Sequence, residues 1–167
     1  MSIVNVRSKN KIPQTALEYI QSSPYPFYLT GSRFFGHNLK NSDWDFFSDD
    51  SQARIDDLQT NGFRRVKNLL KRLDYIDTIQ PIVQIWEKEN VQVQLVKDVE
   101  LKRRVQEFIR DMDLYKKLGM NHRLDSTVEA SEINAAYKKM NRMIWNIATI
   151  IVTDMIKTIR DNAERRS

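Results

Sequence analysis

The chain has 167 residues, 41% of them hydrophobic and 29% charged, a composition typical of one soluble globular domain and not of a disordered chain. It contains no cysteine and two histidines, which excludes disulfides and thiolate metal sites and argues against a histidine-rich zinc site. A formal net charge of +5 favours an anionic partner such as a nucleotide or RNA. The first residues lack the apolar core of a secretory signal, so we expect a cytoplasmic protein.

The first predicted elements are a short helix and a strand. Residues 14–21 follow Pro13, and proline favours the first position of a helix. The run 27–30 then leads into Gly31 and Ser32. Because glycine lets the backbone turn sharply and approach a ligand closely, this run predicts a strand that ends in a tight turn.

A second strand is predicted ten residues after this turn, at the sequence Asp43-Trp44-Asp45-Phe46-Phe47. On a strand, the two aspartates point to one face of the sheet while Trp44 and Phe46 point to the other. Two carboxylates on one face can hold Mg²⁺ beside a triphosphate. The two strands together therefore predict half of a metal-dependent nucleotide site.

This part of the chain, from the first strand to the second, resembles the nucleotidyltransferase superfamily related to DNA polymerase beta. The resemblance implies an α+β fold with a small mixed sheet flanked by helices. It implies that the Gly31 backbone and the Ser32 hydroxyl bind the triphosphate, and that Asp43 and Asp45 are catalytic and hold Mg²⁺ or Mn²⁺ for an NTP such as ATP. Arg33 follows directly, and its planar guanidinium suits a phosphate oxygen.

A helix and an edge strand are expected next. Residues 51–61 read as a helix that Asp49 or Asp50 caps and Gly62 ends, because acidic side chains accept hydrogen bonds at helix starts and glycine favours the position after a helix end. Residues 63–66 read as an edge strand. The following stretch, 68–74, has no clear pattern.

A hairpin is predicted from the alternation of apolar and polar residues in 82–87 and 91–96, on either side of a short polar break. The family pattern asks for a third carboxylate on the second of these strands. Gln92 and Gln94 share one face of it, and one of them stands where the acid would be expected. A neutral amide is no general base at neutral pH.

Two acids could replace the missing carboxylate. Asp98 has the same parity along the chain as Gln92 and Gln94, and would substitute if the strand runs that far. Glu87, on the partner strand, is a weaker candidate. The third carboxylate in such enzymes binds a second metal, so its loss should slow chemistry more than binding.

Two helices are predicted for the remainder. Residues 99–118 carry an apolar stripe and end at Gly119, and a connection at 120–128 leads to a long helix at 131–162. The long helix has apolar side chains at alternating spacings of four and three: Ile133, Tyr137, Met140, Ile144, Ile147 and Ile151. We expect a core at 1–98, followed by C-terminal helices at 99–167, within one compact domain.

The apolar seam of the long helix leaves its partner open. It predicts packing against the domain's own sheet or a neighbouring helix, or a homodimer or helical partner subunit that binds through residues 133–159. Polar residues interrupt the apolar stretch 143–156, which is shorter than the roughly 20 residues needed to span a membrane. We therefore expect no membrane partner.

Two functional hypotheses follow from the sequence. The first is a minimal nucleotidyltransferase that transfers a nucleoside monophosphate from a metal-bound NTP to an acceptor hydroxyl on an RNA end, a protein or a small molecule, and releases pyrophosphate. The second is a degenerate protein that keeps the fold and binds a nucleotide or nucleic acid without turnover. Gln92 and Gln94 are the main support for the second hypothesis.

Overall fold

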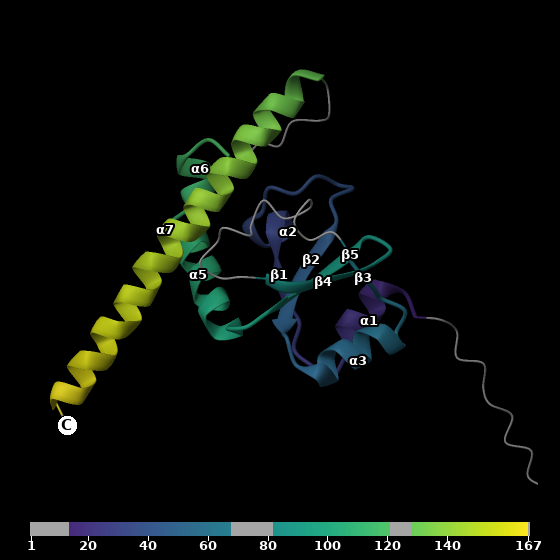
Figure 1. Ribbon diagram of the computed structural model, residues 1–167. Helices are drawn as coiled ribbons and strands as arrows, with labels where there is room; N and C mark the ends of the chain where they lie inside the picture. The colour runs from purple at the N-terminus through teal and green to yellow at the C-terminus, as the bar shows by residue number, and fades with distance from the viewer. Residues whose placement is uncertain (1–13, 68–81, 121–127, 167) are drawn as a thin grey trace, which may run out of the picture.

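A computed structural model describes residues 14–67, 82–120 and 128–166. Within these residues the protein has an α+β fold, in which helices flank a mixed sheet and a long helix ends the chain (Figure 1). The predicted fold class is therefore confirmed. The unassigned stretch 68–74, Pro13 and most of the predicted connection at 120–128 lie outside the described residues.

The described sheet has the strand order β1-β2-β5-β4-β3. The central pair, β2 with β5, is parallel, and the other neighbours are antiparallel. The strands are β1 (Tyr28–Thr30), β2 (Trp44–Asp49), β3 (Arg64–Arg65), β4 (Ile82–Lys88) and β5 (Val91–Val96). The predicted hairpin and edge strand are thus confirmed, because β4 and β5 pair around a turn at 89–90 and β3 lies at the edge of the sheet.

One face of the sheet is covered by two helices, α1 (Ala16–Ser22) and α3 (Gln52–Thr60). Phe46, Val93 and Trp86 from three neighbouring strands are buried together against these helices. Because side chains alternate along a strand, the residues directly before and after these three point to the opposite face of the sheet. The site predicted from the sequence therefore lies on the face away from α1 and α3.

The N-cap of α3 differs from the prediction. The Ser51 side chain, not that of Asp49 or Asp50, accepts the hydrogen bond from the Arg54 backbone N–H (3.3 Å). Asp49 is still part of β2, and its carboxylate accepts a hydrogen bond from the buried Arg54 guanidinium at 2.8 Å. The strand continues two residues further than expected, so the helix begins later.

The predicted helix 99–118 is two helices. The first, α5 (Val99–Asp111), is followed by α6 (Leu114–Lys117). Asp113 has a left-handed backbone conformation (φ 52°), which interrupts the helical hydrogen bonds. The expected end at Gly119 is retained, because this glycine also has a positive φ (70°).

The long helix α7 (Val128–Arg166) has 39 residues and packs against α5. Tyr137, Met140 and Ile144 of the predicted seam contact the cluster of apolar residues between these helices. Ile147 and Ile151 do not, since they are 53% and 39% exposed. The side chain of Ile133 lies outside the described residues.

The predicted seam residues beyond Ile144 are not buried, because α7 contacts α5 along a line of residues spaced by four. Ala148 and Val152 continue the buried line after Ile144. Each step of four residues advances about 40° around a helix. The line of contact therefore turns away from the predicted seam, whose alternating steps of four and three stay on one side of the helix. No helix in the described part of the chain is long and apolar enough to cross a membrane.

Candidate functional site

The Gly31 turn and the Asp45 carboxylate lie against each other. Thr30, the last residue of β1, is the register partner of Asp45 on β2. Gly31 follows with φ +69°, and a Cβ at this position would lie under 3.0 Å from Asp45 Oδ2 and 3.1 Å from Asp45 Cβ and Cγ. With the Asp45 carboxylate in this position, only glycine fits beside it, so Gly31 and Asp45, one residue from each half of the sequence motif, lie together in space.

Three polar side chains follow one another across the sheet. The register aligns Asp45 on β2 with Gln92 on β5, and Gln92 with Glu87 on β4. All three point to the face away from α1 and α3, since their neighbours Phe46, Val93 and Trp86 fill the other face. Of the candidates for the third-acid position, Gln92 is thus the one that lies beside Asp45 in the sheet.

The other two candidates for that position lie elsewhere. Gln94 is paired in register with Phe47 rather than with Asp45; its side chain is buried, and its Oε1 has no hydrogen-bond partner among the described residues. Asp98 lies beyond the end of β5 and is the N-cap of α5, where its carboxylate accepts a hydrogen bond from the Leu101 N–H (3.0 Å). Asp98 is therefore engaged in starting a helix.

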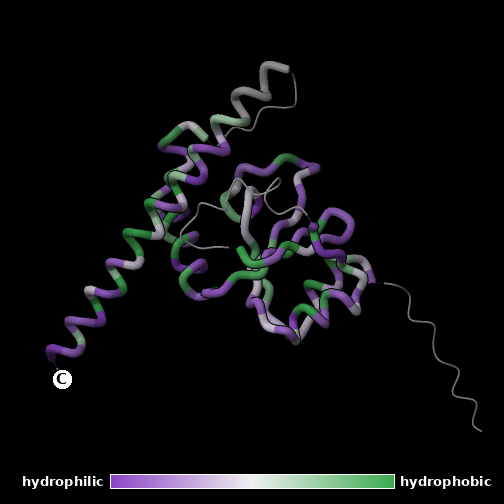
Figure 2. The backbone as a smooth tube through the Cα atoms, in the orientation of Figure 1, coloured by the Kyte–Doolittle hydropathy of each residue, from purple (hydrophilic) through white to green (hydrophobic). Residues whose placement is uncertain are grey.

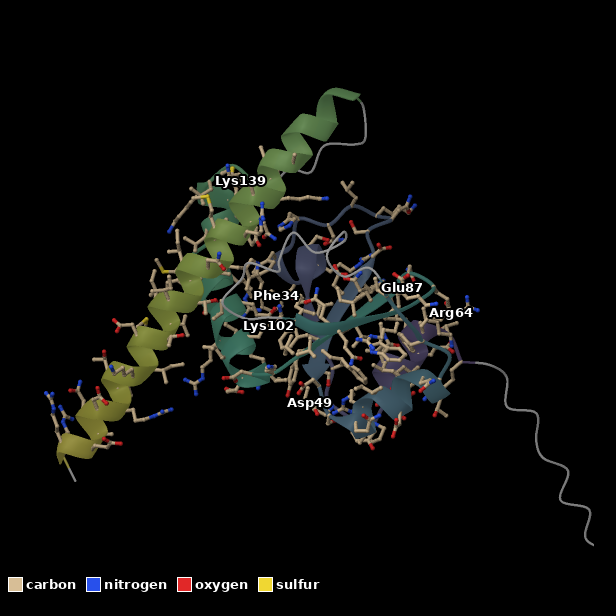
Figure 3. All side chains as sticks on the ribbon, viewed as in Figure 1. Phe34, Asp49, Arg64, Glu87, Lys102 and Lys139 are labelled. Carbon is tan, nitrogen blue, oxygen red and sulfur yellow. The ribbon has the colours of Figure 1, made fainter. Side chains whose placement is uncertain are left out.

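Lys102 of α5 reaches this face of the sheet and was not predicted as a site residue (Figure 3). Its side chain is 7% exposed, and its ammonium lies 5.3 Å from the ring centroid of Phe47 and 4.5 Å from that of Trp145. Burial lowers the Lys102 pKa from 10.5 to about 8, and the nearby Asp45 carboxylate opposes this shift. The site thus contains a buried cation beside its central acid.

The sequence holds a signal for Lys102 that a search for acidic ligands overlooks. Lys102 and Gln106 are spaced by four and share the buried face of α5 with Val105 and Ile109. Lysine is rarely buried, so a lysine on the face of a helix that its apolar residues bury is a candidate for a buried cation with a specific partner. The Gln106 Nε2 also donates to the Leu29 carbonyl of β1 at 3.0 Å, which ties α5 to the strand that leads to Gly31.

Arg33 is engaged with the loop that leads to Asp43. Its Nη2 donates to the Ser42 carbonyl (2.7 Å) and its Nε to the Asp43 carbonyl (3.3 Å). Its guanidinium also lies over the Trp44 ring, 4.1 Å from the centroid. These contacts fix the backbone just before β2, so Arg33 positions Asp43; its role toward phosphate stays a prediction.

The remaining predicted residues lie at the edge of the site. Asp43 precedes the first residue of β2 and is exposed, and Ser32 is half-buried in the first turn of the five-residue helix α2 (Gly31–Phe35). In the described part of the chain, no three His, Cys, Asp or Glu side chains lie close enough together to hold a metal ion. Two carboxylates fit one Mg²⁺ that completes its coordination with water and substrate phosphates, but not a pair of ions.

The site is thus built from three parts of the chain: the β1 turn, the start of β2 and the buried face of α5. Asp45 comes from β2 and Asp43 from the residue just before it, the neutral amide comes from β5, and the cation comes from α5. No family model matches the chain, and the comparisons find neither a curated protein nor a solved structure similar to it.

Proposed function

We propose that this protein binds a nucleoside triphosphate together with one divalent cation at the Gly31 turn and the start of β2. Asp43 and Asp45 would hold the cation, and the Gly31 backbone and Ser32 hydroxyl would contact the phosphates. The observation that supports this proposal is the fit of Asp45 against Gly31, where a Cβ would collide with the carboxylate. A glycine that leaves room for a metal-binding carboxylate is what a compact phosphate site requires.

Two features of the site favour binding over efficient transfer. The residue beside Asp45 in the sheet is Gln92, which can neither bind a second metal as a carboxylate does nor accept a proton at neutral pH. Lys102 places an ammonium near Asp45, which offsets negative charge but, unlike a metal ion, offers no coordination positions. We therefore favour a nucleotide-binding protein of the nucleotidyltransferase type with weak or no turnover.

A second candidate function is nucleotidyl transfer to an acceptor hydroxyl on RNA, a protein or a small molecule. The alignment of Glu87 with Gln92 favours it, since Glu87 supplies a carboxylate on the same face of the sheet. Neighbouring strands lie about 4.8 Å apart, so Glu87 is two strands from Asp45, and the long arm of glutamate would have to cover that gap.

A binding titration tests the proposal. Fluorescent ATP analogues should bind in Mg²⁺ or Mn²⁺, with the other NTPs as competitors, and Asp43→Asn and Asp45→Asn should each weaken binding about tenfold or more because each removes a metal ligand. Asp111→Asn, which makes the same change on the exposed surface of α5, is the control. Absence of nucleotide binding by the natural chain, with either metal, would refute the proposal.

A transfer assay separates the two functions. NTPs labelled at the α-phosphate are incubated with Mg²⁺ or Mn²⁺ and bulk RNA or cell extract, and label is sought in macromolecules. Binding without label transfer, together with activity gained by Gln92→Asp, supports the degenerate protein. Label transfer that Asp45→Asn and Glu87→Gln both abolish supports the transferase instead.

A further inference from the structure

Trp145 of α7 lies against two parts of the candidate site. Its half-buried ring is 4.5 Å from the Lys102 ammonium and 6.0 Å, centroid to centroid, from the Phe35 ring. Lys102 is the cation of the site, and Phe35 is the last residue of α2, the helix that begins at Gly31. One side chain of the C-terminal helix therefore contacts both the cation and the element that carries the proposed phosphate turn.

Hydrogen bonds fix the orientation of the Trp145 ring. Its Nε1 donates to the Tyr115 hydroxyl of α6 at 3.0 Å, and that hydroxyl donates to the side-chain oxygen of Asn141, one turn earlier on α7. The Tyr115 ring also packs against Phe35, with centroids 4.7 Å apart. Figure 2 shows hydrophobic residues along α5 and α7 where these helices run side by side, and both rings belong to the cluster between them. The packed cluster thus holds the indole in place.

The Lys102 ammonium is enclosed by aromatic rings. Trp145 and Phe47 lie 4.5 Å and 5.3 Å from it, both inside the roughly 6 Å of a cation–π contact. Phe47 follows Asp45 by two residues on β2, so both side chains point to the same face of the sheet. A lysine has a flexible stem and a strongly hydrated head group, and it turns outward wherever water can reach it. The position of this ammonium near Asp45 therefore depends on Trp145.

We propose that Trp145 is a positioning residue of the nucleotide site, which holds the Lys102 ammonium near Asp45 and the last residue of α2 in place. This inference rests on the proposed nucleotide binding. Without the indole, Lys102 would turn toward solvent, and the phosphates would lose a fixed positive charge. The helix α2 would also lose one of the two rings that anchor Phe35. In this arrangement α7 is part of the site.

Titration of a fluorescent ATP analogue with Mg²⁺ tests this role. Trp145→Leu should weaken binding about tenfold or more, because it removes the aromatic face from Lys102. Trp145→Phe keeps an aromatic ring at the same place and should bind within about threefold of the natural chain. Val152→Ala is the control for loosened packing, since Val152 is buried on the same side of α7 about 10 Å beyond Trp145. It should leave the affinity nearly unchanged.

A double-mutant cycle tests whether Trp145 acts through Lys102. Once Lys102→Met has removed the charge, Trp145→Leu should weaken binding clearly less than it does in the natural chain. Labelling the three tryptophans with 5-fluorotryptophan gives a fluorine NMR reading that needs neither nucleotide nor the leucine variant. The resonance that is missing in Trp145→Phe should move more in Lys102→Met than the other two do. Circular dichroism checks that each variant stays folded.

The outcomes separate this inference from the proposed function. If the natural chain binds no nucleotide, the proposed function fails and the inference fails with it. If the natural chain binds and Trp145→Leu binds equally well, only the inference is overturned. The same holds if Trp145→Phe or Val152→Ala loses as much affinity as Trp145→Leu, if the effects of Trp145→Leu and Lys102→Met simply multiply, or if Lys102→Met leaves the Trp145 resonance unmoved.

Discussion

Replacing Gly31 by alanine should destabilise the protein through its contact with Asp45. Two costs are expected. An L-residue at φ +69° loses about 1–2 kcal/mol relative to glycine. The new methyl group would also lie under 3.0 Å from Asp45 Oδ2, and relieving such overpacking typically costs about 1–3 kcal/mol. The free energy of unfolding should therefore fall by about 2–5 kcal/mol.

The chain offers a matched control for this change. Gly36 ends α2 with φ +80°, and a Cβ placed there has nothing within 4 Å. Gly36→Ala should therefore carry the conformational cost of about 1–2 kcal/mol without the steric one. Urea unfolding followed by circular dichroism gives both free energies, and their difference isolates the contact with Asp45.

A double-mutant cycle sharpens the assignment. When Asp45→Ala removes the carboxylate, the same Gly31→Ala change should cost about 1–3 kcal/mol less than it does in the natural chain. The reasoning is refuted if Gly31→Ala is no more destabilising than Gly36→Ala, or if its cost is the same with and without the Asp45 carboxylate. Either result would mean that Gly31 is not needed to make room for Asp45.

Two further predictions concern a buried charge and a helix cap. The pKa of Lys102 is about 8 in the folded protein, below its value near 10.5 in the unfolded chain. Between these pH values the unfolded state binds more protons, so the free energy of unfolding, measured without added metal, should rise from pH 8 to pH 10. Lys102→Met should remove this slope and raise stability at pH 7 by up to about 3 kcal/mol, as thermal unfolding across this pH range would show; an unchanged slope would contradict the prediction. Ser51→Ala should cost about 1 kcal/mol in urea unfolding, whereas Asp50→Ala should cost almost nothing, and the reverse order would restore Asp50 as the cap of α3.

The elements that could be predicted are those whose local sequence pattern fits only one secondary structure. The hairpin of β4 and β5 follows from two stretches of alternating character on either side of a polar turn, and β1 follows from an apolar run that leads into Gly31. The cap of α3 could not be chosen in this way, because Asp49, Asp50 and Ser51 are all good caps. Where β2 ends decides between them, and the pairing of Asp49 with Val96 extends β2 that far.

The parts that could not be predicted depend on contacts between distant elements. The break at Asp113 carries no glycine or proline, so the apolar stripe of α5 continues in sequence where the helix does not. The seam of α7 depends on the angle at which α5 crosses it, and local spacing does not encode that angle. In the site, Asp43 and Asp45 were visible as a motif, whereas Lys102 enters through the packing of α5 on the sheet.

The net charge of the proposed site would suit a triphosphate even though Gln92 supplies no third carboxylate. A site with three carboxylates and two divalent ions has a net charge of +1. Here two carboxylates, the Lys102 ammonium and one divalent ion also give +1, since a lysine of pKa about 8 is mostly protonated at neutral pH. The expected attraction for a triphosphate is then similar, but the Lys102 ammonium, unlike a second metal ion, could not bind and activate an attacking hydroxyl. Gln92→Asp would therefore restore a ligand without removing the cation, and the double change Gln92→Asp with Lys102→Met should gain more transfer activity than Gln92→Asp by itself.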